Sequence, residues 1–133
     1  FLKEQRETIR IIGAQPAEGA SIAGIRAWPP GYEPVIRAQA RIDRVEEVSQ
    51  QAAEDMTRRL AREEGIFCGV SSGGAAVIAL RVAEQLAAER SAAARQAPTS
   101  DGVPAPGAVE PATVVFIVCD RGDRYLSTGL FAG

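Results

Sequence analysis

Short runs of β-branched and other apolar residues recur along the chain and predict its strands. Residues 8–14 and 113–118 carry such side chains on both faces, which is typical of strands covered on both sides in a parallel sheet. Residues 42–48 and 66–70 predict two further short strands. Residues 15–39 form a long irregular segment rich in glycine and proline, and loops of that length are uncommon in compact domains unless they have a function.

Two further segments predict helices. Residues 49–64 repeat apolar side chains at helical spacing, Ser49 can cap the first turn, and Gly65 can supply the left-handed residue that ends the helix. Residues 71–74 lead directly into a second helix that extends to about Arg90. Because strands and helices alternate, the expected fold is α/β, with three layers built on a mostly parallel sheet.

The composition excludes several classes of protein. The chain has 133 residues, of which 46% are hydrophobic and 24% charged, with a net charge of −2. No apolar run approaches the roughly 18 residues that cross a bilayer, so we expect no membrane association. A mildly acidic chain lacks the basic face that nucleic acids require. The two cysteines stand apart without CxxC spacing, which favours a reducing, cytoplasmic location.

Histidine is absent from the sequence, and this absence is informative. Neither a Ser-His-Asp triad nor a metal site that depends on imidazole can be completed, and we predict no metal site. Lys3 is the only lysine. Residues 91–111 are dominated by alanine, proline, glycine and serine without periodicity, and they predict a flexible surface insertion.

The most distinctive motif is Gly69-Val70-Ser71-Ser72-Gly73-Gly74, placed between a predicted strand and a helix. Ligands of parallel sheets bind beyond the carboxyl ends of strands, near helix N-termini, and glycines allow a ligand close to the backbone. A plain capped turn would explain the same residues. The motif also matches a nucleophile elbow with Ser71 as nucleophile, but that mechanism needs a histidine.

Three blocks together resemble the O-acetylserine sulfhydrylases, also called cysteine synthases. Residues 63–75 resemble the late glycine–serine turn of that family, and residues 119–128 resemble the C-terminal signature of its B isozyme. Residues 15–19, followed by residues 24–29, also resemble the B type. The blocks keep the order and spacing of the family apart from the insertion at residues 91–111.

The resemblance implies a fold-type II (tryptophan synthase β-like) enzyme that depends on pyridoxal 5′-phosphate (PLP). It implies that Ser71 hydrogen-bonds the pyridine nitrogen of PLP, since the matching serine does so in the family. Arg26 matches a loop residue at the mouth of the active site, where a guanidinium suits an anionic sulfur donor. Ala27 stands where the B type commonly has a second arginine, which leaves the preferred donor open.

The resemblance also shows what this chain lacks. The Schiff-base lysine and the phosphate loop of the family have no counterpart here, and Lys3 has the wrong neighbours. We therefore expect residues 1–133 to be the C-terminal part of the larger domain, inactive alone. The full-length enzyme is expected to make L-cysteine from O-acetyl-L-serine and sulfide or thiosulfate, as a homodimer. The alternatives are a cystathionine β-synthase, a serine/threonine dehydratase, or a non-catalytic interaction module that uses the loop around Trp28 and Tyr32.

Overall fold

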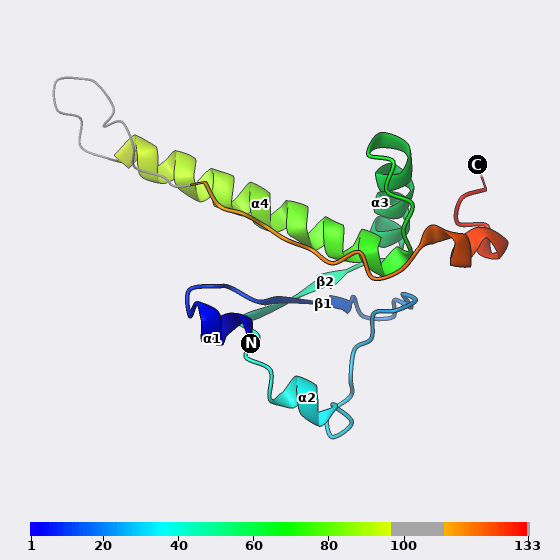
Figure 1. Cartoon of the computed structure of the whole chain (residues 1–133), viewed down its shortest axis with the longest axis horizontal. Coiled ribbons are helices and arrows are strands. Elements are labelled where there is room, and N and C mark those ends of the chain that lie inside the picture. The colour runs from blue at the N-terminus through cyan, green and yellow to red at the C-terminus, as the bar shows by residue number, and fades with distance from the viewer. Residues whose placement is uncertain (97–110, 133) are drawn as a thin grey trace.

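The fold is α/β with two parallel strands. The computed structural model describes residues 1–96 and 111–132. The elements follow in the order α1 (Leu2–Gln5), β1 (Ile12–Pro16), α2 (Val35–Ala38), β2 (Arg44–Val48), α3 (Gln50–Glu63), α4 (Val70–Gln96) and the 3-10 helix η1 (Gly122–Thr128) (Figure 1). The strands pair in parallel from Ile12 opposite Arg44 to Pro16 opposite Val48. The predicted fold class is thereby confirmed.

Just before the strand pair begins, the side chain of Asp43 accepts a backbone hydrogen bond in place of a strand partner. Asp43 Oδ2 accepts the backbone N–H of Ile11 at 2.6 Å, and the carbonyl of Ile11 accepts the N–H of Asp43 at 2.9 Å. The ladder therefore starts one residue later on each strand. The prediction of a strand over residues 8–14 was wrong in its bounds, because β1 begins at Ile12 and continues to Pro16.

Helix α3 has the bounds that the sequence indicates. The Ser49 hydroxyl accepts the backbone N–H of Ala52 at 3.2 Å and so satisfies one of the free donors of the first turn. At the other end, Gly65 has a φ of +68°, and the N–H of Ile66 bonds the carbonyl of Leu60 at 2.9 Å. The left-handed glycine thus lets the chain fold back on the last turn of the helix, which is a common way for a helix to end.

Helices α3 and α4 pack so closely that a glycine is required between them. A Cβ on Gly73 would lie 2.1 Å from Thr57 Oγ1 and 2.3 Å from the carbonyl oxygen of Ala53. Thr57 is fully buried, and its hydroxyl donates to the Ala53 carbonyl at 2.7 Å, so it leaves no unsatisfied donor at the contact. Helix α4 also contacts both strands. The main buried cluster comprises Ile22, Val48, Ala53, Val70, Val77, Ile78, Val82 and Leu130.

Two predicted strands are absent from the described part of the chain. Residues 66–70 form only a single bridge, between Cys68 and Arg121, and Val70 is already helical. The carbonyl of Gly69 accepts the N–H groups of Ser72 and Gly73, so the first turn of α4 replaces the strand.

Residues 113–118 are extended but pair with neither β1 nor β2. They run back along α4, drawn in orange in Figure 1, with Phe116 packed against the small cluster of Leu60, Cys68 and Ala76. Val115 and Ile117, on either side of Phe116, are 83% and 71% exposed. The prediction of a central strand here is wrong for this chain, because a strand needs a neighbour and none of the described residues supplies one.

Helix α4 is longer than predicted. It continues past Arg90 to Gln96, so the first six residues assigned to the insertion at 91–111 are helical. Residues 97–110 lie outside the described residues, and the insertion there stays a prediction. Within the described ranges, no helix combines the length and apolar character needed to cross a membrane.

Candidate functional site

Ser71 lies in the first turn of α4, beyond the carboxyl end of β1. Its side chain is 7% exposed, and its hydroxyl forms no hydrogen bond with another described residue. The loop comes close to it at Gly24, where an added Cβ would lie 3.0 Å from both Cβ and Oγ of Ser71. Gly24 has a φ of +86°, which favours glycine. The structure thus leaves the Ser71 hydroxyl available at a close contact between helix and loop.

The loop against Ser71 is anchored on the core. Ile22 and Ile25 form an isolated bridge around Gly24, and Ile22 is 5% exposed within the main buried cluster. Ile25 Cδ1 would meet a Cβ on Gly74 at 2.8 Å, so this glycine of α4 leaves room for the isoleucine. The residues that follow Ile25 are therefore held beside the start of α4.

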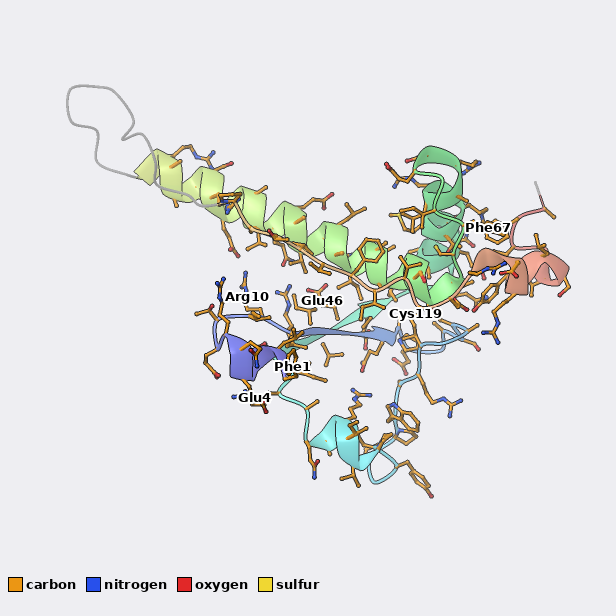
Figure 2. All side chains as sticks on the ribbon, viewed as in Figure 1. Phe1, Glu4, Arg10, Glu46, Phe67 and Cys119 are labelled. Carbon is orange, nitrogen blue, oxygen red and sulfur yellow. The ribbon has the colours of Figure 1, made fainter. Side chains whose placement is uncertain are left out.

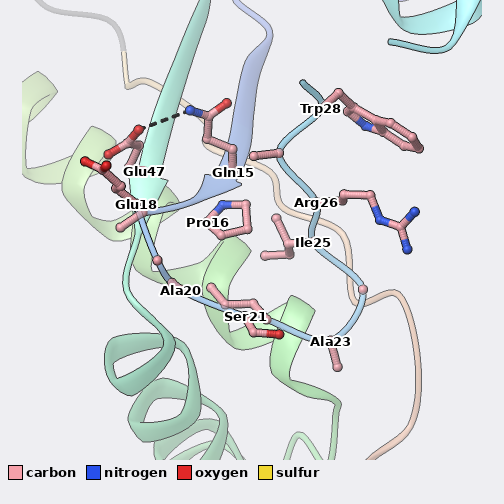
Figure 3. Close-up of a pocket in the computed structure, with 15 residues that line it drawn as sticks. Gln15, Pro16, Glu18, Ala20, Ser21, Ala23, Ile25, Arg26, Trp28 and Glu47 are labelled. Carbon is pink, nitrogen blue, oxygen red and sulfur yellow. Dashed lines mark hydrogen bonds between the residues drawn. The ribbon is translucent and has the colours of Figure 1, made fainter. Parts of the chain in front are cut away.

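A pocket of about 910 Å³ is lined by residues 15–28 and Glu47. Arg26 projects on one side of it, with its guanidinium 5.3 Å from the ring centroid of Trp28, a distance typical of cation–π contacts. Glu18 and Glu47 lie on the opposite side, where Gln15 donates a 3.1 Å hydrogen bond to Glu47 (Figure 3). The pocket therefore has a basic side and an acidic side.

The structure brings the two sequence-predicted site residues to one region. Arg26 lines the pocket and Ser71 does not, but Gly24 lines it and contacts Ser71. A ligand that reached from the Ser71 hydroxyl into the pocket would pass this glycine. The pairing of Arg26 with Trp28 was not foreseen, although the spacing of two residues in an extended loop allows it.

Backbone hydrogen bonds join the C-terminal turn to the start of α4. The N–H of Gly69 bonds the Asp120 carbonyl at 3.3 Å, and the N–H of Gly122 bonds the Phe67 carbonyl at 3.0 Å. The Cys119 N–H donates to Ser72 Oγ at 3.1 Å, and Figure 2 shows Cys119 close to the N-terminal end of α4. Sequence reasoning missed Ser72, because its partner lies 47 residues away.

The two aspartates of the C-terminal turn have different partners. Asp123 forms an ion pair with Arg121 at 3.1 Å between exposed side chains. Asp120 Oδ2 instead accepts the Tyr125 hydroxyl at 2.7 Å. Asp120 Oδ1 is buried without a hydrogen-bond partner among the described residues. Tyr125 and Asp120 both lie in the block of residues 119–128, but nothing in that block indicates that the two side chains are paired.

The two cysteines and the lysine differ in their surroundings. Burial raises the pKa of the Cys68 thiol, which disfavours the thiolate. Cys119 is exposed and free, and sequence reasoning did not assign it a catalytic role. Lys3 Nζ lies 2.5 Å from Asp43 Oδ1 in an ion pair, with 12% of its side chain exposed. No described group of acidic or thiol side chains could hold a metal ion.

Several known proteins resemble this chain in sequence or in fold. Cysteine synthase B of Pseudomonas aeruginosa is 47% identical over 131 residues, which cover 98% of this chain and 36% of that protein. The crystal structure of cysteine synthase from Entamoeba histolytica matches with a TM-score of 0.69 and 30% identity, over 99% of this chain and 35% of that one. An O-acetylserine-dependent cystathionine β-synthase from Helicobacter pylori matches with a TM-score of 0.62 and 31% identity, over 98% of this chain and 37% of that one.

The chain spans little more than a third of the length of these relatives. Residues 1–120 match the family described as pyridoxal-phosphate-dependent enzymes. This match covers well over half of the chain and includes the Ser71 turn, the Arg26 loop and Cys119. The chain belongs to the family of pyridoxal-phosphate-dependent enzymes and has the α/β fold of its cysteine synthase branch.

Proposed function

We propose that these residues are part of an enzyme that makes L-cysteine from O-acetyl-L-serine and a sulfur donor, sulfide or thiosulfate. The 47% identity to cysteine synthase B across 98% of the chain carries this proposal. Residues 1–133 would form the C-terminal part of the larger domain, because residues 63–75 and 119–128 resemble the late turn and the C-terminal signature of the family. They match only about a third of each relative. The complete enzyme supplies the remaining parts of the site.

The described residues fit one part of a PLP site. PLP withdraws electrons from a bound amino acid and so stabilises negative charge on its α-carbon. Ser71 would hold the pyridine nitrogen, because its hydroxyl is nearly buried, lacks a partner among the described residues and faces the loop at Gly24. A neutral hydroxyl does not protonate the ring as a carboxylic acid would, which suits loss of acetate from the β-carbon of the substrate.

Arg26 would bind the sulfur donor. Its guanidinium lies at the pocket, and its planar donors match an anion such as thiosulfate. Trp28 limits the directions that this side chain can take, because the ring lies under the guanidinium. Ala27 provides no second positive charge, so binding of a doubly charged donor would depend on Arg26.

Two alternative functions are other enzyme activities, and a third is a non-catalytic binding module. The likeness to an O-acetylserine-dependent cystathionine β-synthase keeps a larger thiol donor as a second candidate. A serine/threonine dehydratase would eliminate without adding sulfur. A non-catalytic module that binds a partner through Trp28 and Tyr32 would require that the complete protein lack the lysine motif; Tyr32 is 77% exposed.

We further propose that the complete enzyme is a cytoplasmic homodimer. The two cysteines are free, which fits a reducing compartment. Its substrates would be small molecules, as the names of the similar cysteine synthases indicate.

The test uses the full-length protein with bound PLP. Cysteine formation from O-acetylserine is measured with sulfide and with thiosulfate, for the unmodified protein and for Ser71→Ala and Arg26→Ala. Ser71→Ala should retain PLP and slow the loss of acetate. Arg26→Ala should raise KM for thiosulfate and leave acetate loss nearly unchanged. Formation of cystathionine or of a keto acid in place of cysteine would contradict the proposal.

A further inference from the structure

Ser71 and Ser72 are adjacent but have opposite surroundings. Successive helical residues project roughly 100° apart around the axis, so the two hydroxyls lie on different faces of the helix. Ser71 faces Gly24 of the loop, and its hydroxyl has no partner among the described residues. Ser72 is fully buried, and its Oγ accepts the backbone N–H of Cys119 at 3.1 Å. The second serine therefore interacts with the C-terminal turn, and not with the pocket.

Residues 119–122 are joined to the start of α4 by backbone hydrogen bonds and by one bond to a side chain, that of Ser72. The neighbouring links run from Gly69 to Asp120 and from Gly122 to Phe67. These links flank the first turn of α4, with Gly69 two residues before Ser71 and Ser72 directly after it. The turn that carries Ser71 is thus attached at both ends to residues 119–122.

The contact leaves little room for adjustment. A Cβ on Gly69 would lie 2.2 Å from Asp120 Oδ1 and 2.5 Å from Tyr125 Cε2, so the C-terminal turn packs directly on the helix backbone. If the Ser72 hydroxyl were removed, the Cys119 N–H would lose the acceptor that holds it against the buried start of α4. Because Cys119 is exposed, its N–H would bond water instead, and the link between residue 119 and the helix would be lost.

We propose that Ser72 is a positioning residue for the cofactor site, because its hydroxyl fixes residues 119–120 on the first turn of α4 and so sets the direction of the Ser71 hydroxyl. The proposal rests on the function proposed above. Ser72 touches neither cofactor nor substrate in this role and acts through Ser71.

The experiment uses the full-length enzyme and compares Ser72→Ala with Ser72→Cys and Val82→Ala. Ser72→Cys keeps a weaker acceptor at the same position. Val82→Ala is the control for lost stability, because Val82 is 6% exposed in the same helix but lies three turns beyond Ser72. The readouts are hydrogen exchange of the Cys119 amide without PLP, the visible circular dichroism of bound PLP, and kcat and KM.

We expect the Cys119 amide to exchange fastest in Ser72→Ala, more slowly in Ser72→Cys and slowest in the unmodified enzyme. The dichroism of the cofactor band should change in the same order, and kcat should fall roughly ten- to hundredfold in Ser72→Ala with a smaller change in KM. Val82→Ala should lower the melting temperature and leave the cofactor band unchanged.

Two outcomes would overturn the role of Ser72. One is a Cys119 amide whose exchange is unaffected by Ser72→Ala. The other is faster exchange while the cofactor band and kcat stay as in the unmodified enzyme, which would make Ser72 merely structural. Failure of the proposed function is distinct, since the unmodified enzyme would then make no cysteine, whereas amide exchange without PLP would still report on the Ser72 contact.

Discussion

The hydroxyl of Tyr125 donates a 2.7 Å hydrogen bond to Asp120 Oδ2, and both side chains pack on Gly69 at the start of α4. The bond to the carboxylate, together with partial burial and the negative charge of Asp120, raises the pKa of Tyr125 from 10.0 to about 12. The pair is therefore most stable while the phenol keeps its proton. Its position links the C-terminal turn to the helix that carries Ser71.

Tyr125 should make the stability of the chain depend on pH in the alkaline range. Below pH 10 the phenol is protonated in both the folded and the unfolded chain, and the hydrogen bond contributes fully. Between pH 10 and about 12 the unfolded chain loses this proton first, so the contribution declines, and it is absent above that range. Urea denaturation at several pH values should show a smaller alkaline loss in Tyr125→Phe than in the unmodified chain.

The control for this measurement is Tyr32→Phe, because Tyr32 is 77% exposed. Its alkaline stability profile should match that of the unmodified chain. Identical profiles for the unmodified chain and Tyr125→Phe would show that the hydrogen bond to Asp120 does not contribute.

Alanine substitutions at Gly24 and at Gly19 can separate the effect of contact with Ser71 from the effect of backbone strain. Both have positive φ, at +86° and +75°, so alanine costs roughly 1–2 kcal/mol at either position. A Cβ at Gly24 would meet Ser71 at 3.0 Å, whereas a Cβ at Gly19 meets nothing within 4 Å. In the full-length enzyme, Gly24→Ala should weaken PLP binding, as measured by fluorescence titration, and Gly19→Ala should only reduce stability. Equal PLP affinities in the two variants would show that the loop does not press on Ser71.

The parts of the fold that the sequence predicts well are those with local causes. The start and end of α3 depend on Ser49, on Gly65 and on apolar residues one turn apart, all within one segment. A strand depends on a partner from elsewhere, and the pattern of residues 113–118 contains no information on whether that partner is present. The prediction of a strand at residues 66–70 was also wrong. The apolar pattern there does not show that the Gly69 carbonyl already accepts the first hydrogen bonds of α4.

The candidate site likewise contains residues that the sequence predicts and contacts that it does not. Ser71 and Arg26 lie in segments whose residue types resemble a known family, so both could be named from the sequence. Ser72 and Tyr125 also lie in such segments, but their contacts depend on the folded chain. The partner of Ser72 is 47 residues away, and nothing in residues 119–128 indicates that Tyr125 bonds Asp120. Only the folded chain shows that Gly24 approaches the first turn of α4 and that Asp120 and Tyr125 pack on Gly69 just before it.

Lys3 should be a poor amine for PLP. Its Nζ is paired with Asp43 at 2.5 Å, and the bond to Lys3 and that to the Ile11 amide lower the pKa of the Asp43 carboxyl, so the carboxylate stays charged at neutral pH. The 133-residue chain mixed with PLP and reduced with borohydride should show little pyridoxyl-Lys3 by peptide mapping. Asp43→Asn should increase the labelling, because the ammonium loses its charged partner.

Glu46→Gln is the matched control, since Glu46 pairs with Arg44 and not with Lys3. It should leave the labelling unchanged. Stoichiometric labelling of Lys3 in the unmodified chain, together with turnover of O-acetylserine, would refute the proposal that the cofactor lysine lies elsewhere in the complete enzyme.

Ile117 should have opposite effects in the 133-residue chain and in the full-length enzyme. In the chain, Val115 and Ile117 are 83% and 71% exposed on an extended segment that pairs with neither strand, and such edges associate with other copies. Ile117→Lys removes no buried contact and adds a charge, so it should increase the monomer fraction in sedimentation. Ala112→Lys adds the same charge at an exposed position just before the segment and should have little effect.

In the full-length enzyme, residues 113–118 are predicted to form a central strand. A buried lysine is strongly unfavourable there, so Ile117→Lys should prevent folding. A full-length Ile117→Lys protein with unchanged stability would show that this segment stays exposed there as well.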